Sequence, residues 1–122
     1  MTDFINYEVM SDFEINVLFL KWIRNTRGFY QDHNILPMPH AGDDRSVGVK
    51  QNDNYFWYDF CNSPADTFKY LRDHKITLIP LQEDDRWMGL TAFEGKKVTR
   101  YAGYHTNPLR AGIQAILAKA DA

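Results

Sequence analysis

The chain has 122 residues, a net charge of −2 and a hydrophobic fraction of 44%. This length suits one domain, residues 1–122, around a single hydrophobic core, and the composition excludes a disordered tail. The acidic balance argues against a general nucleic-acid-binding protein, which needs a basic surface. The single cysteine, Cys61, excludes an intrachain disulfide and favours a reducing compartment. No apolar run reaches the ~20 residues that span a membrane, and the first residues lack a signal-peptide pattern, so we expect a cytoplasmic protein.

The first helix has marked ends. Ser11 and Glu14 have the spacing of a capping box, in which each side chain bonds the backbone N–H of the other residue. Apolar residues then recur at helical spacing, from Ile15 to Ile23. Gly28 is a typical helix stop, because glycine readily takes the left-handed conformation. The sequence therefore predicts a helix from about residue 12 to residue 27.

Residues 31–54 are expected to be mostly irregular. They contain two prolines, Pro37 and Pro39, and two clusters of turn-forming residues, with a short strand predicted only at 46–50. A loop of this length inside a small domain is typical of a functional or mobile segment.

The remaining residues predict strands alternating with helices. The expected strands are 55–60, 76–79, 86–93 and 97–104, the last two joined by a turn at Glu94-Gly95-Lys96. The expected helices run from Pro64 to about His74 and from Pro108 to about Lys119. We predict an α+β fold with a small antiparallel sheet of four to five strands flanked by three helices.

The start of the last predicted helix is a candidate functional site. Asn107 and Pro108 suit the cap and first helical position, and Arg110 adds a positive charge to the same turn. A helix N-terminus attracts anions, so one interpretation is an anion or phosphate site shared with Arg100 or His105. The other interpretation is a helix cap alone, with Arg110 paired to an acid such as Asp66.

Aromatic and basic residues are mixed on the predicted strands. They are Tyr55, Trp57, Arg86, Trp87, Lys97, Arg100, Tyr101 and Tyr104. Aromatic rings stack on bases and arginines hold phosphates, although the same rings also pack ordinary sheets. The candidate ligand-binding residues are Trp87, Arg100, Tyr101, His105, Asn107 and Arg110.

No pattern of catalytic or metal-binding residues is present. The acid pairs Asp43-Asp44 and Asp84-Asp85 lie in turn-like segments, and no two histidines have the spacing of a helical zinc motif. The glycine-rich motifs of nucleotide-binding enzymes and the G-x-S-x-G motif are also missing. We therefore expect no cofactor, no metal and no catalytic residue.

Three segments carry a family resemblance: residues 7–16 (YEVMSDFEIN), residues 62–66 (NSPAD) with the helix that follows, and residues 107–111 (NPLRA). In this order the chain resembles the NinX-type proteins of tailed phages. It is also similar in layout to the broader phage ABA sandwich domain, in which helices flank a small sheet. Residues 31–54 match nothing in that pattern.

The resemblance implies a small phage-encoded accessory protein in the host cytoplasm, and it supplies no catalytic residue. The first functional hypothesis is a protein that binds and modulates a host factor or a host defence component. The alternatives are a binder or sponge of a small anionic, nucleotide-like ligand and, last, an enzyme built from the acid pairs and histidines. Exposed aromatic residues on an edge strand would favour a symmetric homodimer, but the sequence does not identify the edge.

Overall fold

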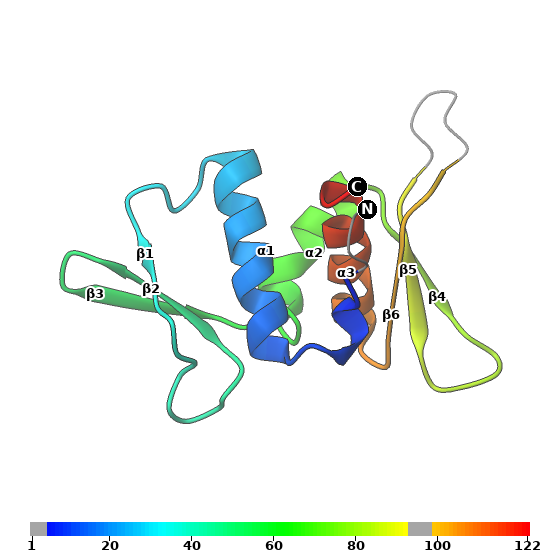
Figure 1. Ribbon diagram of the computed structural model, residues 1–122, viewed down its shortest axis with the longest axis horizontal. Coiled ribbons are helices and arrows are strands. Elements are labelled where there is room, and N and C mark those ends of the chain that lie inside the picture. Colours follow the sequence, from blue (N-terminus) through cyan, green and yellow to red (C-terminus); the bar gives the residue numbers. More distant parts are fainter. Residues whose placement is uncertain (1–4, 93–98) are drawn as a thin grey trace.

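The computed structural model describes residues 5–92 and 99–122 (Figure 1). The predicted helices and strands are nearly all found. In chain order the elements are η1 (Tyr7–Val9), α1 (Asp12–Arg27), β1 (Asn34–Ile35), β2 (Val47–Gln51), β3 (Asn54–Tyr58), α2 (Pro64–Asp73), β4 (Thr77–Pro80), β5 (Trp87–Leu90), β6 (Ala102–His105) and α3 (Pro108–Ala120).

The α+β class is confirmed, but the prediction of a single sheet is wrong. The described strands form two antiparallel sheets of three strands each, ordered β1-β2-β3 and β4-β5-β6. The short strand predicted at 46–50 is confirmed as β2, and the segment 31–54 also contains β1, which was not predicted. The turn predicted at 94–96 lies outside the described residues.

The two sheets are separate because helices lie between them. Figure 1 shows α1 and α3 between the sheet of β1–β3 and the sheet of β4–β6. All residues from Arg110 to Leu117 of α3 are buried, so this helix is covered on every side. A helix buried all round forms the centre of a core, whereas a helix that flanks a sheet buries one stripe. The expectation of three flanking helices is corrected accordingly.

The helix ends follow the local sequence signals. Ser11 Oγ accepts the Glu14 N–H at 3.1 Å and Glu14 Oε1 accepts the Ser11 N–H at 3.2 Å, which completes the predicted capping box. Gly28 ends α1 with a φ of 75°. Both signals act over a few residues, which is why the sequence located these ends correctly.

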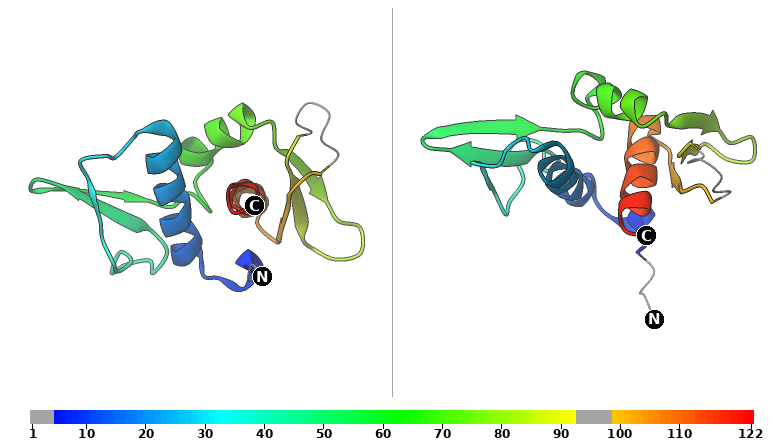
Figure 2. Two further views of the ribbon diagram at one scale, coloured as in Figure 1. Left: turned by 45° about the horizontal axis from the view of Figure 1, so that its top comes forward. Right: turned by 90° about the horizontal axis from the view of Figure 1, so that it is seen from above.

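The β2–β3 hairpin extends away from the helices (Figure 2). Val47 and Val49 of β2 are fully buried in the core cluster that includes the apolar face of α1. Residues paired across the two strands share a face, so Trp57, which pairs with Gly48, lies on the opposite face from Val47 and Val49. The base of the hairpin is anchored in the core while its outer face points to solvent.

Candidate functional site

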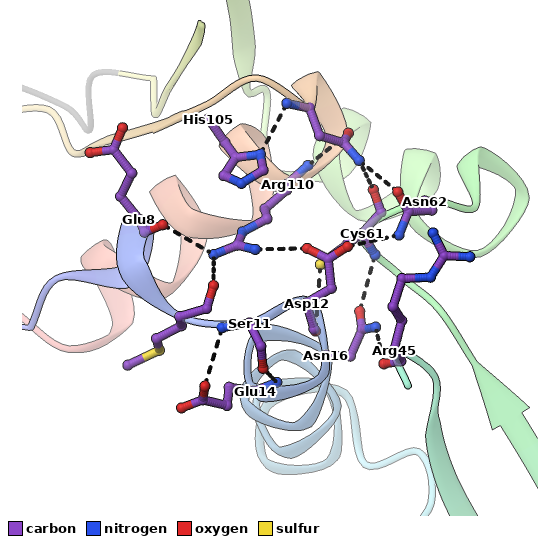
Figure 3. Close-up of polar contacts among 12 residues, drawn as sticks. Glu8, Ser11, Asp12, Glu14, Asn16, Arg45, Cys61, Asn62, His105 and Arg110 are labelled. Carbon is purple, nitrogen blue, oxygen red and sulfur yellow. Dashed lines mark hydrogen bonds and ion pairs between the residues drawn. The ribbon is translucent and has the colours of Figure 1, made fainter. Parts of the chain in front are cut away.

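Arg110 is buried, with only 3% of the surface of the residue exposed. Its Nη1 donates to Asp12 Oδ1 at 2.7 Å and its Nε donates to Gln114 Oε1 at 2.8 Å. Its Nη2 donates to the carbonyl oxygens of Tyr7 at 3.0 Å, Glu8 at 3.5 Å and Met10. The guanidinium therefore binds α1 and η1 to α3, and Asp12, rather than the expected Asp66, is its acidic partner (Figure 3).

Asn107 connects the start of α3 to the segment before α2. Its Oδ1 caps the helix by accepting the N–H of Leu109 at 3.0 Å and, more weakly, that of Arg110 at 3.5 Å. Its Nδ2 donates to the Cys61 carbonyl at 2.7 Å and to Asn62 Oδ1 at 2.9 Å. The predicted cap is confirmed, and its amide group also makes long-range contacts that no sequence pattern indicated.

A buried asparagine extends this network into α1. Asn16 Oδ1 accepts the Cys61 N–H at 3.0 Å, and its Nδ2 donates to the Arg45 carbonyl at 2.9 Å and to Asp59 Oδ1 at 3.0 Å. We call Asp12, Asn16, Asn62, Asn107 and Arg110 the polar network (Figure 3). Asp12 and Asn16 were missed as site residues, although both lie in the first segment of the resemblance.

The polar network is where the three segments of the resemblance meet in space. Residues 7–16, 62–66 and 107–111 each supply hydrogen-bonding groups to it. Buried polar groups are stable only when they are hydrogen-bonded, and each member here has protein partners. The network holds the helices together, and in this conformation Arg110 offers no exposed surface for a ligand.

Asp12 makes the stability of the network dependent on pH. Burial raises the pKa of this carboxyl, but hydrogen bonds from Asn62 and Arg110 outweigh burial and lower the pKa below its ordinary value. A lowered folded-state pKa stabilises the fold above the unfolded-state pKa, near 4, and this contribution is lost as the pH falls through the folded-state value.

We therefore expect Asp12→Asn to be much less stable than wild type at pH 7 and closer to wild type at pH 3. Protonated Asp12 resembles the asparagine, so the difference in the free energy of unfolding should shrink below about pH 4. Urea denaturation at a series of pH values measures this difference. A difference that does not change with pH would contradict the role given to Asp12.

The six predicted ligand-binding residues do not gather at one place. Three of them, His105, Asn107 and Arg110, form hydrogen bonds within the protein. His105 Nδ1 accepts the Asn107 N–H at 3.0 Å, and burial lowers the pKa of this imidazole. Trp87 pairs in register with His105 on the neighbouring strand and is partly buried. Arg100 and Tyr101 lie elsewhere, in a surface groove.

This groove has a volume of about 450 Å³ and lies between η1, β6 and α3. Arg100, Tyr101 and Tyr104 line one side, and Tyr7 and Glu8 line the other. The Arg86 guanidinium lies 5.6 Å from the centre of the Tyr104 ring and binds Glu8 at 2.7 Å. The groove thus combines aromatic rings with charges of both signs, which suits a small polar molecule.

One member of each acid pair has local structural partners. Asp43 caps a turn by accepting the N–H groups of Arg45 and Ser46, and these bonds lower the pKa of its carboxyl to about 2. Asp84 accepts two hydrogen bonds from Arg86. Within residues 5–92 and 99–122, no three metal-ligating side chains lie together. In the same part of the chain, no helix is both long and apolar enough to cross a membrane.

The β2–β3 hairpin presents three exposed aromatic residues in a row. Tyr55, Phe56 and Trp57 are 54%, 41% and 38% exposed. The Trp57 ring covers Gly48, where a Cβ atom would lie 2.5 Å from it, and His40 packs edge-on at 4.8 Å. Lys50 lies over the Tyr55 ring at 5.6 Å. These contacts hold the Tyr55 and Trp57 rings in place on the outer face while leaving much of their surface open, and Phe56 lies on the opposite face, where it pairs with Val49.

Comparisons with protein-family models, curated proteins and solved structures found no match to this chain. The resemblance to NinX-type phage proteins therefore rests on the three sequence segments.

Proposed function

We propose that this chain is a small phage-encoded accessory protein without catalytic activity that binds and modulates a protein of the host. The observation that carries the proposal is the exposed aromatic hairpin, in which Tyr55 and Trp57 lie side by side on a face turned away from the core. Tyrosine and tryptophan are the residues that most often dominate protein–protein interfaces, because they bury a large rigid surface and also form hydrogen bonds.

The rest of the structure supports a binding role. The conspicuous polar residues of the described chain, Asp12, Asn107 and Arg110, are engaged in internal hydrogen bonds. The aromatic hairpin, in contrast, leaves large parts of the Tyr55 and Trp57 side chains exposed to solvent. Contiguous exposed apolar patches on small proteins mark interaction sites.

The groove beside Tyr101 supports a second candidate function, binding of a small anionic ligand. Arg100 and Tyr101, two of the six predicted residues, line it together with Tyr104. Arg100 Nε donates to the Thr91 carbonyl at 2.6 Å, which fixes the side chain at the groove. Aromatic rings with a neighbouring guanidinium are the chemistry that recognises nucleotides.

One experiment separates the two functions. The tagged protein is expressed in a bacterial host, purified gently and measured by native mass spectrometry, alongside the double variant Tyr55→Ser/Trp57→Ser and the groove variant Tyr101→Ser. For host-protein binding we expect a stoichiometric protein partner with wild type and with Tyr101→Ser. With the double variant, the amount of bound host protein should fall by more than about tenfold, since such aromatic anchors dominate binding energy.

Circular dichroism of each variant serves as the folding control. Absence of any stoichiometric protein, or an equal yield with the double variant, would contradict the first function. A small mass that is released on denaturation and is missing from Tyr101→Ser would instead support the ligand-binding function.

A further inference from the structure

Strand β3 is an edge strand, because the sheet order is β1-β2-β3. Edge strands expose unpaired N–H and C=O groups, and natural proteins usually protect them with charges, prolines or bulges. Here Asn54–Tyr58 contains no charged residue and no proline, and it pairs with β2 without a bulge. Figure 2 shows β3 along the border of its sheet, on the side away from α1.

The register identifies the main-chain groups that face outward. The Gly48 carbonyl accepts the Leu36 N–H at 2.9 Å, so the main chain of Gly48 bonds toward β1. Residues in an antiparallel pair alternate between those that exchange hydrogen bonds and those that do not. Trp57 pairs with Gly48, and its N–H and C=O groups therefore point away from β2. The same alternation turns those of Tyr55 outward.

We infer that β3 pairs antiparallel with β3 of a second copy of this chain, with Phe56 on the twofold axis. In this register Tyr55 of each copy lies opposite Trp57 of the other, and these are the residues whose main-chain groups are available. Two such pairs form four main-chain hydrogen bonds. Aromatic side chains then lie opposite aromatic side chains along the strand, an arrangement that stabilises paired strands.

The uncharged residues of β3, Asn54–Tyr58, favour this register over its neighbours, because only here do they pair entirely with one another. Centring the pair on Tyr55 would place Asp53 opposite Trp57, and centring it on Trp57 would place Asp59 opposite Tyr55. With Phe56 at the centre, both acids lie beyond the paired segment. There Asp53 of each copy faces Asp59 of the other, and this contact between like charges weakens the pair. The Arg45 guanidinium, 3.7 Å from the Asp59 carboxylate, offsets part of that repulsion.

The shape of the chain allows this dimer. The hairpin points away from the helices, so an antiparallel partner places its own helices at the opposite end of the paired strands (Figure 1). The β1–β3 sheet of one copy and the β1–β3 sheet of the other then form one sheet of six strands. Tyr55 and Trp57 of both copies lie on the same face of it. The dimer therefore goes beyond the proposed function, since it doubles the aromatic face offered to a host protein and leaves that face uncovered.

The first test uses charge exchange at Phe56, a partly exposed position. Sedimentation equilibrium from micromolar to millimolar protein should show a dimer for wild type. Phe56→Lys and Phe56→Glu should each be monomeric, because like charges would meet on the twofold axis. An equimolar mixture of the two variants should recover the dimer. Circular dichroism confirms that each variant is folded.

The second test reads the register with single cysteines. Paired residues that exchange no hydrogen bonds lie about 4.5 Å apart at Cα, within reach of a disulfide. Phe56→Cys should form a disulfide-linked dimer under mild oxidation. Tyr55→Cys and Trp57→Cys should not, because two residues along the strand separate each from its copy by about 8 Å. Wild type is the control, since Cys61 is buried and burial raises the pKa of its thiol.

The inference is overturned if wild type is monomeric throughout, if the mixture of charge variants forms no dimer, or if either charge variant alone still dimerises. It is also overturned if Tyr55→Cys or Trp57→Cys cross-links as fast as Phe56→Cys. A monomer that captures a host protein would contradict this inference alone, leaving the β3 edge to a foreign strand. A dimer that captures none would contradict the proposed function alone.

Discussion

Replacing Arg110 with alanine is expected to lower the free energy of unfolding by about 3–5 kcal/mol, the usual cost of removing one partner from a buried ion pair. The substitution would leave the Asp12 carboxylate without its guanidinium, which lies 2.7 Å away. It would also leave Gln114 Oε1 and three carbonyl groups of residues 7–10 without a charged donor. Urea denaturation followed by circular dichroism measures the change.

Arg86→Ala is the matched control. Arg86 pairs with two carboxylates, one more than Arg110, Glu8 at 2.7 Å and Asp84 at 3.0 Å, but its side chain is on the surface. Surface ion pairs contribute about 0–1 kcal/mol, so this variant should be nearly as stable as wild type. If Arg110→Ala costs no more than Arg86→Ala, the polar network does not hold the helices together, and the anion-site interpretation of Arg110 regains its support.

Replacing Gly89 with alanine is expected to lower the free energy of unfolding by about 3 kcal/mol, at the upper end of the usual cost of overpacking. Gly89 of β5 pairs with Gly103 of β6, and the pair lies directly against α3. A Cβ atom at either glycine would lie 2.4 Å from the Ala111 carbonyl oxygen. This neighbour is backbone, so the sheet of β4–β6 would have to move away from the helix.

Gly42→Ala tests whether the effect is specific to the helix contact. A Cβ atom at this exposed glycine would meet only the His40 ring, at 3.3 Å, and a side chain can move. Its unfolding free energy should change by less than about 0.5 kcal/mol, as for most surface substitutions. Equal losses in the two variants would contradict the close packing of β5 on α3. Thermal unfolding of both proteins makes the comparison.

The site residues show how far sequence reasoning reaches. Asn107 was predicted both as a cap and as a ligand residue, and the cap is confirmed. The sequence could predict it because the hydrogen bonds of the cap reach only two and three residues along the chain. Arg110 was placed correctly at the same helix start, but its partner Asp12 is 98 residues away. A charge within one turn of a helix N-terminus looks the same in sequence whether it faces solvent or the core.

The sequence by itself determined the local elements: the ends of α1 at Ser11 and Gly28, the cap of α3 at Asn107 and the aromatic strand β3. These depend on hydrogen bonds and side-chain preferences within a few residues. Only the tertiary structure decided that α3 is central, that the strands divide into two sheets and that β3 is an edge. Those properties depend on which elements pack together, and burial around a helix or beside a strand is set by neighbours that lie far away in the chain.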